Sequence, residues 1–215
     1  MVSADASLPR PRLLDLFCCQ GGAGKGYADA GFEVTGVDVD PQPLYPFTFH
    51  QADANTYPFD GFDALHASPP CQDHSASLRL HGKEHETGWM LAHITKRFQS
   101  SGLPYVIENV VGAAMNAPAM LCGTTFGLGL HRHRLFEASF ELMSPGCDPS
   151  AVRHRGRDAQ VFGHHANSKR VREEWGVEWM TRYGIAQSIP PVFAQYVGER
   201  LMQVVLERKL TTTRS

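Results

Sequence analysis

A cysteine, Cys71, follows two successive prolines directly after a short apolar run over residues 62–67 that reads as a strand. Open α/β sheets place their ligands at the carboxyl ends of their strands. The prolines stiffen the backbone, so a thiol at this position would be held ready for attack. A cysteine whose pKa is lowered by cations or by a helix N-terminus is a nucleophile. The segment therefore predicts covalent catalysis by Cys71, the alternative being a proline-rich turn with an incidental cysteine.

Two further groups of polar residues adjoin predicted strands. Glu108 closes an apolar run over residues 104–108. A carboxyl group so placed is often buried enough to be protonated, which makes it a hydrogen-bond donor or a general acid. Arg132 and Arg134 alternate around His133 just before a strand, so both guanidinium groups should point to one side. Two arginines on one side attract a phosphate or the edge of a base.

A glycine-rich loop over residues 20–24 separates a predicted strand from a predicted helix. The backbone N–H groups of such a loop, together with the helix dipole, can hold an anionic group. Asp38 ends the next predicted strand, where a carboxylate can accept hydrogen bonds from both hydroxyls of a ribose. Gly21, Gly22 and Asp38 together predict a nucleoside cofactor. The alternative is a tight turn beside a carboxylate that only caps a loop.

Strands and helices must alternate along the chain to position these groups. Helical spacing over residues 86–100 and an amphipathic pattern over residues 190–210 predict two of the helices. The continuous apolar character of the strands favours a parallel sheet that is covered on both faces. The alternation predicts an α/β protein with a doubly wound, mostly parallel sheet. The predicted strands cover residues 12–17, 32–40, 62–67, 104–108 and 134–138.

The composition is that of an ordinary soluble domain. The 215 residues are 42% hydrophobic and 20% charged, which is enough for one sizeable core. No run approaches 18 apolar residues, and the first residues lack the apolar core of a signal peptide. We therefore expect a cytoplasmic monomer with no membrane segment.

Five cysteines stand at positions 18, 19, 71, 122 and 147, without a Cys-x-x-Cys pair. This spacing predicts neither a disulfide framework nor a structural zinc cluster, so we expect no metal. Cys122 and Cys147 are interpreted as packing or surface residues. His131 and His133 are interpreted as surface or phosphate-facing residues rather than metal ligands.

Positive charge is concentrated in one region although the chain as a whole carries a net charge of -2. Residues 151–172 contain six lysines and arginines against Asp158 alone, a local charge of +5. They belong to a stretch over residues 139–174 that shows little periodicity and reads as a loop-rich insertion. Such a patch attracts phosphate groups.

The motifs occur together and in a particular order. The chain resembles the DNA cytosine-5 methyltransferases, and among them the small enzymes encoded by bacteriophages, well over residues 13–137 and less well over the terminal helix. The resemblance implies a Rossmann-like class I S-adenosylmethionine-dependent methyltransferase with a short loop-rich target-recognition insertion. The motifs that carry it are Asp15-Leu16-Phe17 with Gly21-Gly22, Asp38, Asp53, Pro69-Pro70-Cys71-Gln72, Glu108-Asn109-Val110 and Arg132-His133-Arg134.

The resemblance implies a reaction on a base that is extruded from duplex DNA, because C5 and C6 of a stacked cytosine cannot be reached. Cys71 would attack C6, and Glu108 would hydrogen-bond N3 and the exocyclic amino group as charge develops. C5 would then accept the methyl group. By the same resemblance, Arg134 would approach the flipped base and Arg132 would brace the loop.

The cofactor implied by the resemblance is S-adenosyl-L-methionine. Phe17 would contact the adenine, Asp38 the ribose hydroxyls and Asp53 the adenine amino group. Gly21, Gly22 and Pro70 complete the expected set of cofactor-binding residues.

Four regions are expected along the chain. Residues 1–11 form a flexible N-terminus and residues 12–138 the catalytic and cofactor-binding core. Residues 139–174 form the short basic target-recognition region, and residues 175–210 return to the core. The recognition region is too short for a core of its own, which predicts a target of about two to four base pairs. Its expected DNA contacts are Arg153, Arg155, Arg157, Lys169 and Arg170.

The chain departs from the family pattern at three positions. Cys19 stands where the family has Gly, His74 where it has Phe, and Leu130 where it has Gln. These departures leave open a non-catalytic DNA-binding or decoy protein of the same fold. The presence of Cys71, Glu108, Arg132 and Arg134 argues against the non-catalytic alternative. A separate alternative, methylation of cytosine in RNA, follows from the resemblance, because one branch of the family acts on transfer RNA.

Overall fold

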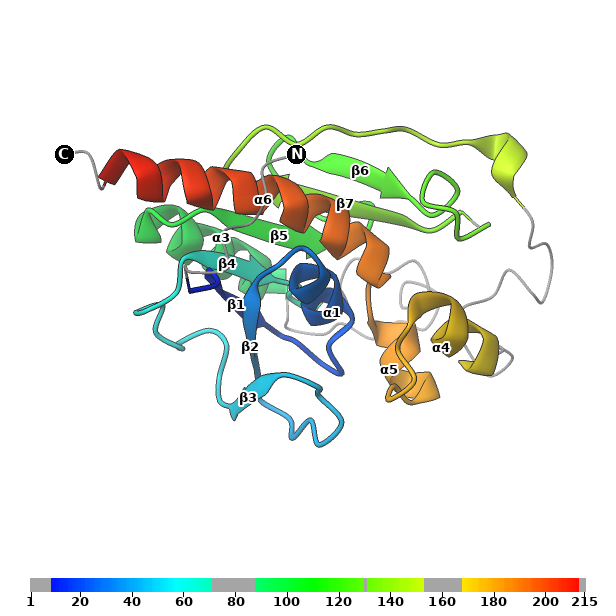
Figure 1. Ribbon diagram of the computed structural model, residues 1–215, viewed down its shortest axis with the longest axis horizontal. Coiled ribbons are helices and arrows are strands. Elements are labelled where there is room, and N and C mark those ends of the chain that lie inside the picture. Colours follow the sequence, from blue (N-terminus) through cyan, green and yellow to red (C-terminus); the bar gives the residue numbers. More distant parts are fainter. Residues whose placement is uncertain (1–8, 71–87, 130, 153–167, 213–215) are drawn as a thin grey trace.

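The structure is a computed structural model, and it describes residues 9–70, 88–129, 131–152 and 168–212 (Figure 1). The described strands form one seven-stranded sheet in the order β3-β2-β1-β4-β5-β7-β6. Neighbours from β3 to β5 are parallel, and β7 runs antiparallel to both β5 and β6. The predicted doubly wound, mostly parallel sheet is therefore confirmed. Its strands are β1 (Arg12–Leu16), β2 (Glu33–Asp38), β3 (Thr48–Gln51), β4 (Ala64–Ala67), β5 (Tyr105–Asn109), β6 (Ala119–Cys122) and β7 (His133–Ala138).

Helices cover both faces of the sheet, and Figure 1 shows the long α6 crossing one of them. Along β1, Leu13 packs in the cluster that contains Phe193 of α6. Its neighbour Leu14 packs in the cluster that contains Phe98 of α3. Alternate side chains of a strand point to opposite faces, so β1 carries leucines on both faces because helices bury both. The described helices are α1 (Gly22–Asp29), α3 (Gly88–Ser101), α4 (Ser168–Trp175), α5 (Arg182–Gln187), α6 (Pro191–Thr212) and the 3-10 helix η1 (Pro149–Ala151).

The register of the sheet brings the ends of four parallel strands to one edge. Leu16 of β1 pairs with Val37 of β2 and with Ala67 of β4, and Ala67 pairs with Ile107 of β5. The antiparallel β7 begins at this edge, because its Leu135 pairs with Asn109. The residues that follow β1, β2, β4 and β5 therefore meet those that open β7.

Five elements were not predicted from the sequence, namely the edge strands β3 and β6, the helices α4 and α5, and the 3-10 helix η1. The edge strands β3 and β6 have four residues each, too few to show a period. Helix α4 lies in the stretch interpreted as loop-rich. Its Val171 and Trp175 lie one turn apart and pack with Val177, Met180 and Ile185, a contact that only the tertiary structure reveals. None of the described helices has the length and apolar composition needed to cross a membrane.

Candidate active site

A cavity of about 550 Å³ lies at the carboxyl edge of the sheet. This volume is in the range of sites for small ligands and cofactors. Of the residues predicted from the sequence, those that line it are Phe17, Asp38, Asp53, Pro70, Glu108 and Arg134.

The described lining of the cavity is acidic. Four carboxyl groups, those of Asp38, Asp40, Asp53 and Glu108, face it against the single guanidinium of Arg134. Asp38 is held by its own neighbours, because its carboxylate accepts hydrogen bonds from the backbone N–H of Cys19 at 2.9 Å and of Asp40 at 3.1 Å. A cationic ligand with hydroxyl groups suits such a lining, whereas the pyrophosphate of a dinucleotide would be repelled.

The loop after β3 offers acceptors to the same cavity. Asp53 Oδ1 accepts hydrogen bonds from the backbone N–H and the side-chain amide of Asn55, both at 2.9 Å. Asn55 Oδ1 is buried and has no hydrogen-bond partner among the described residues. Arg97 of α3 fixes the loop by donating to the carbonyls of Ala54 and Tyr57. The orphaned oxygen of Asn55 suits an amino group of a ligand.

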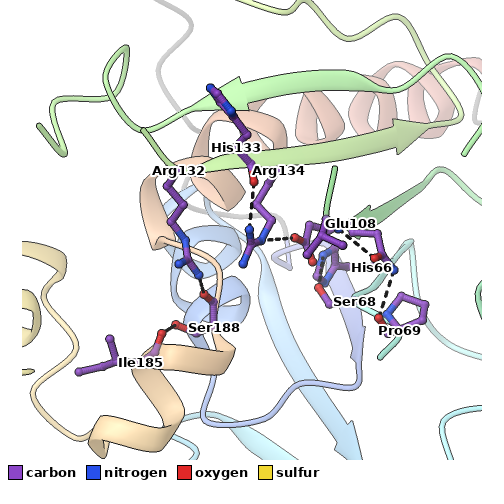
Figure 2. A network of polar contacts seen from close by, with 11 residues as sticks. His66, Ser68, Pro69, Glu108, Arg132, His133, Arg134, Ile185 and Ser188 are labelled. Atoms are coloured by element: carbon purple, nitrogen blue, oxygen red, sulfur yellow. Dashed lines mark hydrogen bonds and ion pairs between the residues drawn. The ribbon is translucent and has the colours of Figure 1, made fainter. Parts of the chain in front are cut away.

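Glu108 and Arg134 form an ion pair at the cavity wall, with Arg134 Nε 2.9 Å from Glu108 Oε1 (Figure 2). The side chains are 7% and 17% exposed respectively, so Glu108 is as buried as the sequence predicts. The sequence did not predict that a guanidinium would cover the carboxyl group. The antiparallel pairing of β5 with β7 brings these two residues together.

Arg132 has a different position. It points to the same side as Arg134, as the alternation predicts, while His133 points to the other side (Figure 2). The Arg132 side chain is buried, donates a hydrogen bond to the carbonyl of Ser188, and lies 5.8 Å from the ring centroid of Trp175. Arg132 thus holds the segment between α5 and α6, and it does not line the cavity.

Asn109 positions the proline loop that precedes Cys71. Its side-chain amide donates to the carbonyl of Pro69 at 3.2 Å, and its Oδ1 accepts from the N–H of Val110 at 2.9 Å. Pro70 lines the cavity. Cys71 and His74 lie outside the described residues, as does Leu130.

A buried polar chain lies under the cavity and was not predicted. His66 Nδ1 lies 2.7 Å from Asp15 Oδ1, and His66 Nε2 lies 3.5 Å from Ser68 Oγ. Asp15 also accepts a hydrogen bond from the hydroxyl of Tyr45. Asp15 and His66 interrupt otherwise apolar strands, and this is the signal that could have found them, because buried polar groups need partners.

The glycine loop packs closely and does not open into the large cavity. Gly21 has a φ of +86°, a conformation that favours glycine. A Cβ on Gly22 would lie 2.7 Å from the carbonyl oxygen of Ile189 and from Ser188 Cβ. Gly22 lines a neighbouring cavity of about 30 Å³, together with Ser188 and Ile189.

The two cysteines of this loop are poor nucleophiles. Burial, together with the charge of Asp15, raises the pKa of Cys18 far above its ordinary value. Burial also raises the pKa of Cys19, to about 11, and the charge of Asp38 adds to the effect. Both thiols are therefore protonated near neutral pH, so neither competes with Cys71 for a nucleophilic role.

The Cys19→Gly substitution is expected to stabilise the protein. Cys19 has a φ of +46°, a left-handed conformation that costs a non-glycine residue roughly 1–2 kcal/mol. Glycine is more flexible in the unfolded chain, so we expect a net gain of about 0.5–1 kcal/mol in the free energy of unfolding. Urea unfolding measures it. Cys18→Gly is the matched control, because Cys18 is buried without a positive φ and its loss should destabilise. Destabilisation by Cys19→Gly would contradict the strain argument.

The structure describes two of the five predicted DNA-binding residues. Arg153, Arg155 and Arg157 lie outside the described residues. Lys169 and Arg170 lie on α4, where they pair with Glu173 at 4.0 Å and Glu174 at 2.7 Å. The positive charge of these two residues is therefore partly compensated within α4.

Comparison with known proteins identifies the fold. No family model matches the chain, and no curated protein sequence matches it. The Entamoeba histolytica methyltransferase EhMeth is similar in structure, with a TM-score of 0.60 at 10% identity over 92% of this chain and 99% of that one.

Two further solved structures share only part of their length with this chain, which spans less than half of each. A DNA modification methyltransferase of an E. coli prophage matches with a TM-score of 0.47 at 20% identity, over 59% of this chain and 45% of its own. Spodoptera frugiperda DNMT2 matches with a TM-score of 0.44 at 18% identity, over 59% of this chain and 48% of its own. The sheet order and the likeness to EhMeth together show that this chain has a Rossmann-like α/β fold.

Proposed function

We propose that this protein transfers a methyl group from S-adenosylmethionine to C5 of cytosine in duplex DNA. One observation carries the proposal. The cavity at the carboxyl edge combines an acidic wall with the Glu108–Arg134 pair, and Pro70, which directly precedes Cys71, lines the same cavity. The described structure thus brings a buried carboxyl group, its arginine partner and the residue that precedes the proposed nucleophile to one cavity, which supports the proposal.

The cofactor fits the described residues. S-adenosylmethionine, when bound, supplies a methyl group on a sulfonium cation, and its other polar groups are hydroxyls, amino groups and one carboxylate. Asp38 would accept from the ribose hydroxyls, and Phe17 would contact the adenine. Asp53 and Asn55 would accept from the adenine amino group, since Asn55 Oδ1 has no other partner among the described residues. An excess of carboxylates stabilises a cation, which favours this cofactor over a nucleotide with phosphates.

The protein's own residues would carry the chemistry in three steps. Cys71 Sγ, as a thiolate, forms a bond to C6, and the electron pair of the C5–C6 double bond becomes available at C5. Glu108 hydrogen-bonds the pyrimidine ring at N3 and the amino group, stabilising the charge that develops there. After methyl transfer, C5 loses its proton to solvent, the double bond re-forms, and the C6–S bond breaks to return the Cys71 thiolate.

Arg134 would change partners when a base enters. In the described structure its guanidinium covers the Glu108 carboxyl group. A cytosine that reaches Glu108 has to take over part of this contact, and the freed N–H groups can then donate to the base. Arg132, held by Ser188 and Trp175, would keep the first residues of β7 in place during this exchange.

The activity is tested on two substrates in parallel. The purified full-length chain is incubated with S-adenosylmethionine and either a mixed-sequence DNA duplex or a transfer RNA pool, and 5-methylcytosine is read by bisulfite sequencing. We expect conversion-resistant cytosines in DNA only. Methylation of RNA alone would replace DNA with the other substrate class. Cofactor binding without methylation of either would indicate a non-catalytic protein.

Asp38→Asn is expected to weaken cofactor binding about 10- to 100-fold, because hydrogen bonds to a charged acceptor contribute about 1.5–3 kcal/mol each. The asparagine keeps an acceptor for the Cys19 N–H, so the loop should remain folded. Isothermal titration with S-adenosylmethionine measures the change. Asp60→Asn is the matched control, because Asp60 is exposed and does not line the cavity. Equal affinity of the two variants would remove Asp38 from the cofactor site.

Replacing Arg153, Arg155 and Arg157 together by Ala is expected to weaken DNA binding broadly. Five phosphate contacts give a slope of the logarithm of affinity against the logarithm of salt concentration of about -4.5, and each lost contact flattens it by about 0.9. Binding titrations at several salt concentrations measure the slope, and cofactor affinity should stay constant. An unchanged slope would assign recognition to another surface.

A further inference from the structure

Four side chains that can bind a metal converge beside the outer strands of the sheet. The sulfur atoms of Cys122 and Cys147 and one ring nitrogen each of His131 and His133 all lie within 4.8 Å of one another. Cys122 Sγ lies 3.7 Å from His131 Nδ1, and His133 Nε2 lies 3.2 Å from Cys147 Sγ. We propose that these four residues bind one structural zinc ion.

The donor set and the spacing suit zinc. Two thiolates and two imidazoles form a tetrahedral set that zinc prefers. With Zn–S bonds of about 2.3 Å and Zn–N bonds of about 2.1 Å, a tetrahedron separates its ligand atoms by about 3.4–3.8 Å. The distances of 3.2 and 3.7 Å lie close to this range, and no two of the four ligand atoms are more than 4.8 Å apart, so side-chain rotations would complete the site. Four protein ligands leave no open position, which is typical of a structural rather than a catalytic zinc site.

Three backbone segments already hold the ligands in place. Cys122 ends β6 and pairs directly with His133 at the start of β7. The segment that carries Cys147 is joined to β6 by a bridge between Leu121 and Gly146. Such a scaffold positions the ligands before an ion binds, which reduces the loss of side-chain and backbone entropy on binding.

Thr124 connects two of these segments beside the cluster. Its hydroxyl lies 3.0 Å from Cys122 Sγ and accepts a hydrogen bond from the N–H of Asp148, the neighbour of Cys147. The Thr124 side chain is buried. Contacts of this kind orient metal ligands and are a regular feature of metal sites.

The cluster lies on the side of β7 opposite to the candidate active site. His131 and His133 alternate with Arg132 and Arg134, and His133 points away from both arginines in Figure 2. A one-residue shift in the pairing register of β7 would exchange the histidines and the arginines between the two faces of the strand. Zinc bound to both histidines and to Cys122 of the neighbouring strand would oppose such a shift. The ion would thereby hold the register that places Arg134 against Glu108.

This proposal replaces the expectation of no metal. The four ligands do not form a Cys-x-x-Cys motif, because antiparallel pairing brings Cys122 to His133 and a separate bridge brings in Cys147. A motif search along the sequence cannot detect ligands that only strand pairing assembles.

Metal analysis of the intact protein tests the proposal without using activity. The full chain, purified without chelator or added metal and without a histidine tag, should contain about one equivalent of zinc. The Cys122→Ser and Cys147→Ser variants should lose it, whereas His50→Gln and Cys18→Ala should keep it. Cobalt added to the chelated wild-type protein should give the visible absorption bands of tetrahedral cobalt bound to thiolate.

A folding defect is separated from metal loss by working with the wild-type chain. Removing zinc with a strong chelator should lower the thermal midpoint by about 5 °C or more and speed hydrogen exchange over β6 and β7, and both effects should reverse on adding zinc. Stoichiometric iron, a Cys122–Cys147 disulfide without metal, or zinc retained by both serine variants would each overturn the proposal.

Discussion

Replacing Cys71 by Ser is expected to lower the rate of methyl transfer by about 10⁴-fold or more, the loss seen when a covalent nucleophile is removed. A serine hydroxyl is far less ionised than a thiol near neutral pH, so attack on C6 should almost cease. Cofactor affinity should stay within about twofold, because the contacts expected for the cofactor come from other residues. Single-turnover methylation and calorimetric titration separate the two quantities.

A trapped adduct gives the same prediction a second readout. When a duplex contains 5-fluorocytosine, loss of a proton from C5 is impossible, so the enzyme should remain covalently attached after methyl transfer. The wild-type chain should shift to higher mass only when cofactor and duplex are both present, and Cys71→Ser and Cys71→Ala should not shift. Cys18→Ala serves as a matched control, since Cys18 is buried and its raised pKa makes it a poor nucleophile. An adduct with Cys71→Ala would show that another residue attacks the base.

The sequence predicted those parts of the fold that depend on local pattern. β1 and β5 carry apolar side chains on both faces because helices cover both faces of the sheet, and these apolar runs can be recognised without a structure. Asp38, Pro70 and Glu108 stand at the ends of such strands, so their common edge followed from the parallel topology. The separate directions of Arg132 and His133 followed from the two-residue period of a strand.

Contacts between segments that are distant in the chain could not be predicted from the sequence. The Asp15–His66 pair depends on the register between β1 and β4. The ion pair of Glu108 with Arg134 depends on the antiparallel insertion of β7 beside β5, which has no local signal. Cys122 was interpreted as a packing residue for the same reason, because its neighbours are set by the pairing of β6 with β7.

Glu108→Gln is expected to lower the rate of methyl transfer by about 10²–10⁴-fold while leaving cofactor affinity nearly unchanged. Glutamine keeps the size of the side chain but can neither carry a negative charge nor give up a proton. It therefore cannot compensate, by changing its own charge, for the charge that develops on the pyrimidine ring when C6 is attacked. Single-turnover rates at saturating DNA report this step directly.

Glu137→Gln is the matched control. Glu137 is also a buried carboxyl group, on β7, but it accepts hydrogen bonds from Asn116 and does not line the cavity. Its substitution should cost stability, about 1–3 kcal/mol in the free energy of unfolding, without a comparable loss of rate. A Glu108→Gln variant that loses stability but less than about fivefold in rate would assign Glu108 a structural role only.

Variants of Arg134 test how the loss of rate in Glu108→Gln arises. If the ion pair holds Arg134 in place for the incoming base, Arg134→Ala alone should also lower the rate. The double variant should then be little slower than Glu108→Gln, because the effects of residues that act as a unit are not additive. If the two side chains act independently on the base, the two losses should multiply. The 2.9 Å contact between them and their shared position on the cavity wall favour the first outcome, in which a cytosine reaches Glu108 by displacing a guanidinium that then remains beside it.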